Sequence, residues 1–309
     1  LDLCPVAEII RMAKTFFTVK KLKMPARLDK VIAIQYPQWG RKAVKKLISS
    51  RKVKVDKKSV WLGSWEVQNG QKIEISEAPV EKPKPIIKFN EGWLLSDEDD
   101  LIAMNKPAGL LSQTTRAGGK DNLLDLCIEK FGKVALFHRL DRDTSGLCLL
   151  TRPGEINAYL DKLFKQRRVV KEYLALVSSQ KEIDAEGVIK TRLRPHPRRR
   201  DQMVVVGKGG FYAESRYEVL GESEGKKLIR IWPITGRSHQ LRVQMSYLGV
   251  PIIGDRIYGG GEKTGLRLML HAHKIELPAA DGFETRSFSA PLGEDFKQLI
   301  PTSLINLLP

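Results

Sequence analysis

The sequence predicts an α+β fold in which a large domain with a mixed, mainly antiparallel sheet follows a small α+β domain. The chain has 309 residues, of which 42% are hydrophobic, and this is enough for two separate cores. Strand-like and helix-like segments follow one another without a regular strand–helix–strand repeat, which argues against a doubly wound parallel sheet. A proline-rich stretch at 78–85 disfavours both helix and sheet pairing and separates the two parts.

The first part of the chain contains an expected extension and the small domain. Apolar residues at helical spacing predict a helix over 5–22, within an N-terminal helical extension of residues 1–24. The small domain, residues 25–78, is expected to begin with a helix near 27–32. A second helix is expected at 41–50, and alternation then predicts strands at 52–56 and 72–75, with a turn at 57–58 that returns through Val60.

The large domain is predicted over residues 93–309, after a linker at 79–92. Short apolar runs with β-branched residues predict strands, and recurrence every three to four residues predicts helices. The expected strands lie at 101–104, 146–151, 173–177, 228–232 and 268–277, and the expected helices at 155–166 and 238–248.

The charge of the chain points to an anionic partner. Its formal net charge is +17, which favours nucleic acid over a membrane surface, and the plainer alternative is unclustered charge that serves solubility. The three cysteines, Cys4, Cys127 and Cys148, are far apart and suggest neither disulfides nor zinc; the last two read as core residues. We find no membrane-spanning run and no secretory signal, so we expect a cytoplasmic protein.

The segment Phe-His-Arg-Leu-Asp-Arg-Asp-Thr-Ser-Gly-Leu at 137–147 is the strongest candidate for a chemical site. It places Asp141 between Arg139 and Arg142, and apolar runs flank it on both sides. Charged groups are costly near a core unless they are paired or used. Asp141 is therefore the first candidate for a reactive side chain.

Three further segments are weak evidence for a chemical site when taken alone, but they strengthen the case made by residues 137–147. Lys-Pro-Ala-Gly-Leu at 106–110 ends a strand in a turn, and the strand at 171–177 carries Tyr173, which by itself is better explained as a core aromatic residue. The run Thr-Gly-Arg-Ser-His-Gln-Leu-Arg at 235–242 opens a helix behind a glycine. Capping by Ser238 explains part of that run, but not its positive charges beside apolar residues.

A cationic face is expected on the small domain, where acidic residues are scarce. Such a face binds phosphates without reading bases, whereas the plainer reading is a solvated helix surface. The runs Arg-Leu-Asp-Lys at 27–30, Lys-Val-x-Val at 52–55 and Gly-x-x-Ile-x-Ile at 70–75 resemble the αL RNA-binding domain of ribosomal protein S-four. This resemblance implies binding to structured RNA through Arg41, Lys42, Lys45, Lys46, Arg51 and Lys52.

The large domain resembles the RluA family of pseudouridine synthases over nearly all of residues 93–309. The motifs that carry this resemblance lie at 106–110, 138–146, 171–177, 236–242 and 248–259, followed by Leu-His-Ala at 270–272. Gln244 and Val250 depart from the usual histidines of the family, at positions away from the catalytic matches. The resemblance implies a pseudouridine synthase fold and the isomerisation of uridine in RNA.

The resemblance also implies roles for individual residues. Asp141 would supply the catalytic carboxylate, either by covalent attack or by taking a ribose proton, and Arg242 would keep it charged. Tyr173 would cover the uracil and take part in removing the C5 proton. Because the target base must be flipped out, Arg139 would fill the gap that it leaves. The other expected substrate-binding residues are Arg142, Lys106, His138 and Leu241, with further phosphate contacts from Arg192, Arg194, Arg198, Arg199 and Arg200.

The expected enzyme is a monomer that needs no cofactor, because the isomerisation requires neither an energy source nor an electron carrier. Its expected partner is RNA, with large-subunit ribosomal RNA favoured and transfer RNA as the alternative. A metal site built from His239, Asp255, His271 and His273 is conceivable, but ordinary packing is the better explanation. Two other classes stay open: a non-catalytic RNA-binding or ribosome-assembly protein, and, less favoured, a hydrolase with an Asp nucleophile.

Overall fold

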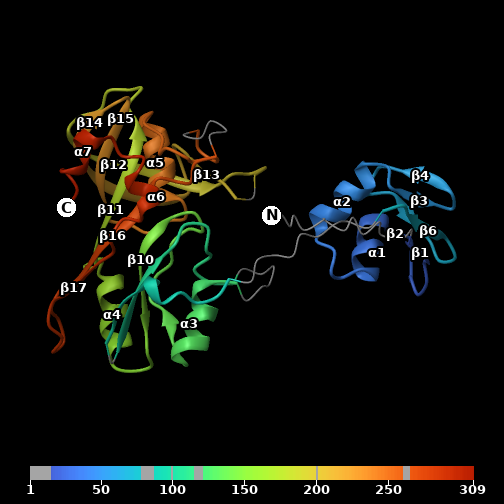
Figure 1. Cartoon of the computed structure of the whole chain (residues 1–309), viewed down its shortest axis with the longest axis horizontal. Coiled ribbons are helices and arrows are strands. Elements are labelled where there is room, and N and C mark those ends of the chain that lie inside the picture. Colours follow the sequence, from blue (N-terminus) through green and yellow to red (C-terminus); the bar gives the residue numbers. More distant parts are fainter. Residues whose placement is uncertain (1–14, 78–86, 99, 115–120, 200, 260–264) are drawn as a thin grey trace, which may run out of the picture. The chain divides into compact units, whose positions relative to one another are not determined.

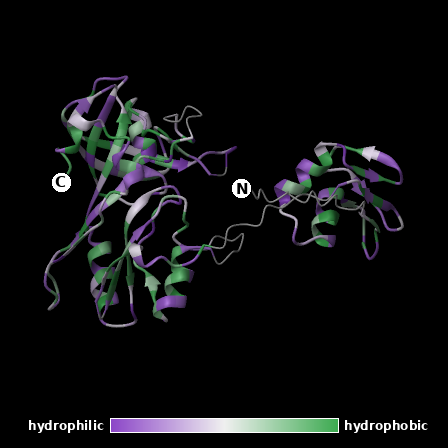
Figure 2. Ribbon diagram, in the orientation of Figure 1, coloured by the Kyte–Doolittle hydropathy of each residue, from purple (hydrophilic) through white to green (hydrophobic). Residues whose placement is uncertain are grey.

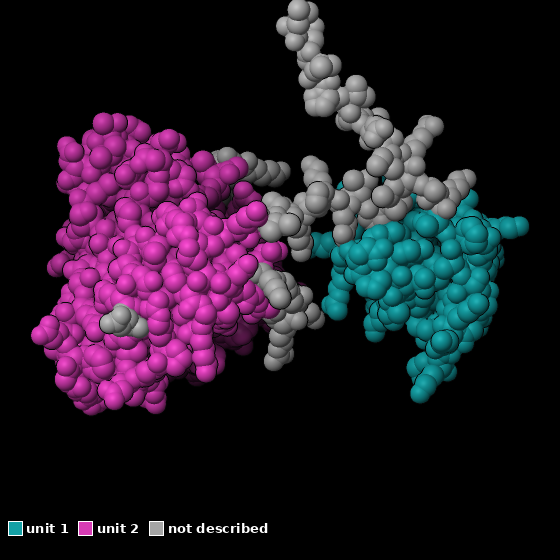
Figure 3. Space-filling view, turned by 60° about the horizontal axis from the view of Figure 1, so that its bottom comes forward, with its two compact units in different colours: residues 1–86 teal, residues 87–309 magenta. Residues whose placement is uncertain are grey.

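The computed structural model describes residues 15–77, 87–98, 100–114, 121–199, 201–259 and 265–309. It divides the chain into two units, residues 1–86 and 87–309 (Figure 3). Part of the linker expected at 79–92 lies outside the described residues. No helix within the described ranges has both the length and the apolar character needed to cross a membrane.

The first unit combines two helices with a four-stranded sheet. Helices α1 and α2 pack on each other, and their buried side chains, among them Ile32 and Ile48, share one core with Val53 and Ile73 of the sheet. The sheet has the order β1-β6-β3-β4, and β2 pairs with β5. The elements are β1 (Thr15–Thr18), β2 (Ala26–Arg27), α1 (Leu28–Gln35), α2 (Arg41–Ser49), β3 (Val53–Val55), β4 (Lys58–Val60), β5 (Glu66–Val67) and β6 (Lys72–Ile75).

The helix expected over 5–22 is wrong where the structure describes it, because residues 15–18 form strand β1. This strand pairs antiparallel with β6. Its side chains alternate: Phe17 packs against the core, whereas Phe16 is 66% exposed. Threonine and phenylalanine favour an extended chain, and their period of two outweighs the looser helical spacing of the preceding apolar residues. Residues 5–14 of the expected helix lie outside the described residues.

The second unit is built on one large sheet, with helices on its faces (Figure 1). The main strand order is β13-β12-β14-β15-β11-β16-β10-β8-β7, with β17 beside β16 and β9 beside β10. The strands are β7 (Leu94–Asp97), β8 (Leu101–Lys106), β9 (Ala135–Leu136), β10 (Ser145–Thr151), β11 (Val170–Ser178), β12 (Glu186–Pro195), β13 (Met203–Val205), β14 (Phe211–Ser223), β15 (Lys226–Pro233), β16 (Leu270–Leu277) and β17 (Arg286–Ser289). The helices are η1 (Glu91–Trp93), α3 (Leu123–Phe131), α4 (Ile156–Lys165), α5 (Gln240–Leu248), α6 (Glu294–Lys297) and α7 (Thr302–Ile305).

The predicted α+β class is confirmed, with a sheet that is mixed and mainly antiparallel. In the large sheet only β10 and β16, among the described strand pairs, run parallel. Strand β10 is buried along its whole length. Cys127 and Cys148 are buried core residues, as predicted. Helix α4 contains both hydrophobic and hydrophilic residues (Figure 2). Its apolar side chains Ile156, Leu160 and Leu163 are buried.

The parallel pair requires a glycine at its start. Gly146 lies opposite Ala272 of β16, and its φ of +108° is one that other residues rarely adopt. A Cβ atom at this position would lie 2.2 Å from the backbone oxygen of Ala272. The same Ala272 lies opposite Tyr173 of β11 on its other side. The glycine therefore lets the segment before β10 approach Tyr173 across a single intervening strand.

A buried histidine links the two parallel strands. The Ser145 hydroxyl lies 2.9 Å from Nδ1 of His271, and Nε2 of His271 lies 3.1 Å from the carbonyl oxygen of Ala290. Since a carbonyl only accepts hydrogen bonds, Nε2 carries the proton and Nδ1 accepts from Ser145. Burial lowers the pKa of His271 to about 4, from an ordinary value of 6.5.

The free energy of unfolding is therefore expected to decrease as the pH is lowered from about 6.5 to about 4. In this window the unfolded chain takes up the His271 proton before the folded chain does, so protonation favours unfolding, with a slope of up to about 1.4 kcal/mol per pH unit. Urea unfolding at pH 7 and pH 5 measures the slope. The variant His271→Gln should show a smaller pH dependence, and an unchanged dependence would contradict this assignment.

Candidate active site

A cavity of about 690 Å³ opens on the second unit where the β9–β10 loop meets β11 and the start of α5. All three predicted catalytic residues, Asp141, Tyr173 and Arg242, line this cavity. They come from three separate parts of the sequence: Asp141 from the loop before β10, Tyr173 from β11 and Arg242 from α5. The cavity is also lined by four of the predicted substrate-binding residues, Arg139, Arg142, His138 and Leu241.

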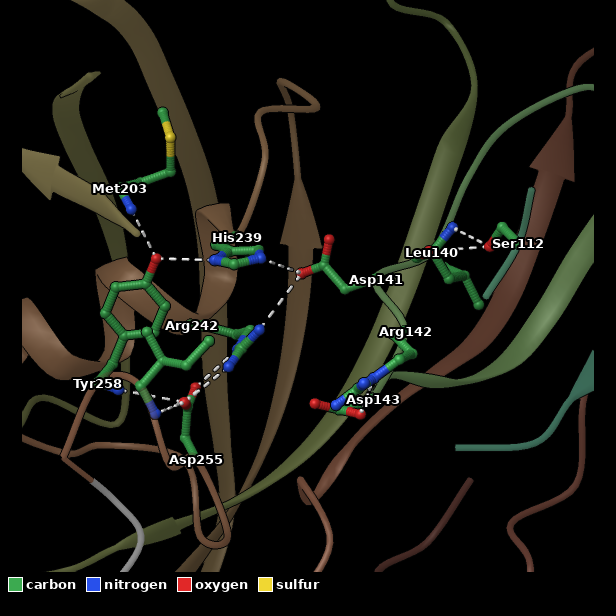
Figure 4. A network of polar contacts seen from close by, with 11 residues as sticks. Ser112, Leu140, Asp141, Arg142, Asp143, Met203, His239, Arg242, Asp255 and Tyr258 are labelled. Atoms are coloured by element: carbon green, nitrogen blue, oxygen red, sulfur yellow. Dashed lines mark hydrogen bonds and ion pairs between the residues drawn. The ribbon is translucent and has the colours of Figure 1, made fainter. Parts of the chain in front are cut away.

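The loop that carries Asp141 is fixed by backbone contacts on both sides of that residue. Ser112 Oγ donates to the carbonyl of Leu140 at 2.8 Å, and the Leu140 amide donates back to Ser112 Oγ at 3.1 Å. On the other side, the Gly109 amide donates to the carbonyl of Arg142 at 2.9 Å. The Asp141 side chain, 30% exposed, is thereby presented to the cavity (Figure 4).

Lys106 does not lie where a substrate-binding residue would. Its side chain is fully buried, and it is not among the cavity-lining residues. Its Nζ donates to the carbonyls of Pro107, Leu110 and Arg142 at 2.8–3.0 Å. Burial lowers the pKa of Lys106 to about 8, which leaves the ammonium group protonated at neutral pH, as three donated hydrogen bonds require. Lys106 therefore stabilises the loop that carries Asp141 through hydrogen bonds to backbone carbonyls on the side away from the cavity lining.

His138 lies on the cavity wall, but its ring is engaged by the neighbouring strand. Its Nε2 accepts from the Leu149 amide at 3.2 Å, and its carbonyl accepts from the Cys148 thiol. Burial, with a smaller effect from the positive charge of Lys171, lowers the pKa of His138 to about 3. The neutral imidazole of His138 is hydrogen-bonded to β10, so it helps to position the loop that carries Asp141.

Arg242 connects Asp141 to a second, buried carboxylate. Its Nε and Nη2 donate to the two oxygens of Asp255 at 2.7 and 2.8 Å, and its Nη1 lies 3.8 Å from Oδ2 of Asp141. Burial lowers the pKa of Arg242, but hydrogen bonding and charge attraction from Asp255 outweigh it, and the net pKa is raised. The cavity thus has a permanent cation, Arg242, beside the side chain of Asp141.

His239 was not among the residues predicted for the site, although it belongs to the motif at 236–242. Its Nε2 lies 3.9 Å from Oδ2 of Asp141, and its Nδ1 lies 2.8 Å from the Tyr258 hydroxyl. The available signal is its spacing from Arg242, because residues three apart share one face of the helix expected at 238–248, although α5 begins only at Gln240. In the sequence, Tyr258 is only part of a motif and Asp255 is a motif residue and a conceivable metal ligand; nothing in the sequence indicates which side chains they contact.

Tyr173 and Lys171 form the wall of the cavity on β11. Burial, and to a lesser degree the negative charge of Asp141, raises the pKa of Tyr173, so its hydroxyl is protonated at neutral pH. Burial lowers the pKa of Lys171, whose ammonium group lies 5.4 Å from the ring centre of Phe164. In the sequence Lys171 is part of the strand motif and has no predicted role, although its side chain also lines the cavity.

The two arginines that flank Asp141 differ in their contacts. Arg139 is exposed at the cavity and makes no hydrogen bond or ion pair within the described part of the chain. Arg142 pairs with Asp143 at 3.0 Å, and both side chains are accessible to solvent. Arg139 is therefore free to contact a ligand, whereas Arg142 must exchange a weak surface ion pair for any such contact.

The residues considered for a metal site are engaged elsewhere. Asp255 is bound to Arg242, and His271 and His273 both lie 3.1 Å from the carbonyl of Ala290. His239 lies beside Tyr258 and Asp141. Within the described ranges, no three His, Cys, Asp or Glu side chains are grouped so as to hold a metal ion.

Comparison with known proteins places these features in a family. The sequence pattern of the RNA pseudouridylate synthase family matches residues 100–247, which include Asp141, Tyr173 and Arg242. The ribosomal large subunit pseudouridine synthase C of Rickettsia felis is 32% identical over 272 residues, which cover 81% of this chain and 88% of that protein. The ribosomal large subunit pseudouridine synthase D of Nitrosomonas europaea is 29% identical over 301 residues, covering 89% of this chain and 83% of its own.

A solved structure agrees with the sequence relatives. The human RNA pseudouridylate synthase domain containing 4 protein superposes with a TM-score of 0.55 and 26% sequence identity, over 69% of this chain and 92% of that one. Sequence pattern, overall similarity and fold therefore lead to one conclusion: the chain belongs to the RluA family of pseudouridine synthases and is an RNA-modifying isomerase.

Proposed function

We propose that this enzyme converts specific uridines of large-subunit ribosomal RNA to pseudouridine, with Asp141 as its catalytic carboxylate. The observation that carries the proposal is the exposure of Asp141 to the cavity while its Oδ2 faces the buried cation of Arg242. The names of the bacterial relatives support the substrate, since both act on the large ribosomal subunit. Together with the bacterial origin of these relatives, that substrate supports the cytoplasmic location that we propose.

The reaction needs a detached uracil to be held while it turns. Asp141 either attacks C1′ as the bond to N1 breaks, or takes the C2′ proton as uracil leaves; both routes need an ionised carboxylate in a partly dry cavity. Tyr173 lines the cavity, and we propose that it covers the base. Because its hydroxyl is protonated at neutral pH, it is better suited to stacking and hydrogen-bond donation than to taking the C5 proton.

A paired or stacked uridine must leave its helix before it can enter the cavity. Arg139 is exposed at the cavity and has no partner within the described ranges, so its planar guanidinium can occupy the space of the flipped base. The arginines of β12 and the turn after it are exposed and can contact phosphates. They are Arg192, Arg194, Arg198 and Arg199; Arg200, also expected here, lies outside the described residues.

Within the first unit, we propose that residues 25–78 form an RNA-binding domain of the ribosomal protein S-four type. Four of its basic side chains, Arg41, Lys42, Lys45 and Lys46, are exposed on α2. Opposite them on the helix, Val44, Leu47 and Ile48 are buried. Arg51 lies 5.4 Å from the ring centre of Trp61, and Lys52 pairs with Glu77, so these two are the less available members of the predicted set.

Charge reversal on α2 should weaken RNA binding without affecting the chemistry. The double variant Lys45→Glu/Lys46→Glu is expected to raise KM and to flatten the salt dependence of affinity, because fewer counterions are released on binding. The matched control is Lys165→Glu/Lys297→Glu, which changes the charge equally at exposed ion pairs of the second unit. Equal affinities of the two double variants at moderate salt would contradict an RNA-binding role for α2.

Tritium release from RNA labelled at uridine C5 tests the substrate. Wild-type enzyme should release tritium from large-subunit ribosomal RNA and none above background from transfer RNA. Release from transfer RNA alone would favour the alternative substrate. The absence of release from every RNA fraction would overturn the proposed function.

A further inference from the structure

The backbone at His239 has an unusual conformation for a residue other than glycine. This residue precedes α5 with φ of 54° and ψ of 18°, in the left-handed region, and its side chain makes no capping hydrogen bond. Such conformations cost energy and persist where the surrounding structure holds them. Here the imidazole ring lies between Tyr258 and Asp141 (Figure 4).

The contacts of the ring assign its proton to Nε2. The Met203 amide donates to the Tyr258 hydroxyl oxygen at 2.8 Å, and within the described ranges the only acceptor near the hydroxyl proton is Nδ1 of His239, also at 2.8 Å. In a neutral imidazole one nitrogen accepts and the other donates. The opposite tautomer would turn the lone pair of Nε2 toward the carboxylate of Asp141, which is unfavourable.

The ring is neutral at ordinary pH. Burial is the main cause that lowers the pKa of His239, and the positive charge of Arg242 lowers it further. The negative charges of Asp141, Asp255 and Asp201 oppose this shift, but the net pKa remains below 6.5. His239 therefore faces Asp141 as a neutral hydrogen-bond donor, and Arg242 faces it as a cation.

One segment orients both of these donors. Asp255 accepts the hydrogen bonds of Arg242, and its Oδ1 also accepts from the amides of Ile257 and Tyr258. The Tyr258 hydroxyl fixes His239, and the Tyr258 ring lies 5.3 Å from the guanidinium carbon of Arg242. Residues 255–258 thus set the direction of both groups that approach Asp141.

Both donors approach the same carboxylate oxygen. The distances of 3.8 Å from Arg242 and 3.9 Å from His239 are both measured to Oδ2 of Asp141. Within the described ranges no side chain donates a hydrogen bond to the other oxygen, Oδ1, and both of these shortest approaches are to Oδ2. Catalytic hydrogen bonds that are long in a free enzyme commonly shorten when the substrate binds.

We propose that His239 is a positioning residue for Asp141: with Arg242 it holds Oδ2, so that Oδ1 is the oxygen that reacts with the ribose of the substrate uridine. This inference rests on the proposed role of Asp141. In the attack route, Oδ1 forms a bond to C1′ while the bond from C1′ to N1 breaks and uracil keeps the electron pair. In the proton-transfer route, Oδ1 takes the C2′ proton as uracil leaves.

Two conservative variants separate the function of the donor from the shape of the site. In His239→Gln the side-chain amide nitrogen reaches about as far as Nε2, so it can donate to Asp141. In His239→Asn the amide reaches only to the position of Nδ1. Asparagine tolerates the left-handed conformation better than glutamine does, so backbone strain alone would favour the asparagine variant.

The measured quantities are kcat and KM for tritium release from C5-labelled ribosomal RNA. We expect His239→Asn to lower kcat about 10- to 100-fold, the loss typical of one hydrogen bond to a charged group, with KM within twofold of wild type. His239→Gln should recover most of that rate. Circular dichroism verifies that both variants are folded.

The Tyr258→Phe variant tests whether Tyr258 acts through His239. It should lower kcat in the wild-type background and have little further effect in His239→Asn, because the two residues form one chain of contacts. A ring ¹⁵N spectrum gives an independent readout. The chain has five histidines, and the signal absent from His239→Asn should be that of a ring protonated at Nε2.

The outcomes distinguish this inference from the proposed function. An active wild type with equally active His239→Asn, or a His239 ring protonated at Nδ1, would overturn the positioning role alone. If His239→Gln is no better than His239→Asn, donation from the Nε2 position is also refuted. A wild type that is inactive on every RNA would overturn the proposed function itself.

Discussion

Replacement of Asp141 by asparagine is expected to abolish tritium release from C5-labelled RNA, with a rate reduction of at least about 10²- to 10⁴-fold. Asparagine has nearly the same shape, but its neutral amide neither attacks C1′ nor takes a ribose proton. The fold should be unaffected, because the Asp141 side chain is 30% exposed and its nearest charged groups lie 3.8 and 3.9 Å away. Single-turnover release measures the effect, with circular dichroism as the folding control.

Asp143 provides the matched control for this variant. It belongs to the same loop and also carries a carboxylate, but it pairs with Arg142 at the surface and is not among the cavity-lining residues. Asp143→Asn should therefore keep the wild-type rate within about twofold, since surface ion pairs contribute little. Activity that survives in Asp141→Asn, or a rate lost in both variants, would contradict the assignment of Asp141.

Replacement of Arg242 by methionine is expected to affect both stability and activity. The variant leaves the carboxylate of Asp255, which is 1% exposed, without its bidentate partner. Removing one member of a buried pair costs about 3–5 kcal/mol, because the remaining charge is uncompensated. Asp141 also loses its cation, so turnover should fall with stability; urea unfolding and tritium release measure the two effects.

The double variant Arg242→Met/Asp255→Asn separates these two effects. It removes the uncompensated charge, and the asparagine oxygen can still accept from the amides of Ile257 and Tyr258. Part of the lost stability should therefore return, while the rate stays low because the cation beside Asp141 is still missing. A double variant that regains both stability and rate would show that Arg242 serves only the fold.

The parts of the fold that could be predicted have strong local signals. Strand β10 contains the uninterrupted apolar run Leu-Cys-Leu-Leu at 147–150, and its whole length is buried. Helices α2 and α4 have clear apolar faces, so period and burial agree. The three residues expected to be catalytic were predictable because each belongs to a recognisable sequence motif. In the structure they line one cavity.

Other parts depend on contacts that the sequence does not display. Strand β12 buries Ile189, Thr191 and Leu193 on one face and exposes charged residues on the other, so its apolar content is low and no strand is predicted there. Its partner β14 pairs with it over eight residues and supplies most of the stabilising contacts from outside the segment. Tertiary pairing of this kind overrides local propensity.

The candidate site shows the same limit. A lysine at the end of a strand can face substrate or core, and only the three carbonyls around Lys106 decide that it faces inward. The sequence places His239 near Arg242, but the direction of its ring depends on Tyr258, which lies 19 residues away along the chain. The motifs therefore predict which carboxylate lines the cavity, whereas the contacts around it become visible only in the packed structure.

We expect the carboxylate of Asp141 to be required for pseudouridine formation in large-subunit ribosomal RNA. This can be measured by mapping pseudouridines in that RNA from cells that lack the protein, complemented with either wild type or Asp141→Asn. We predict that specific pseudouridines disappear without the protein, return with wild type and stay absent with Asp141→Asn. An unchanged pseudouridine map in cells lacking the protein, or restoration by Asp141→Asn, would contradict the claim.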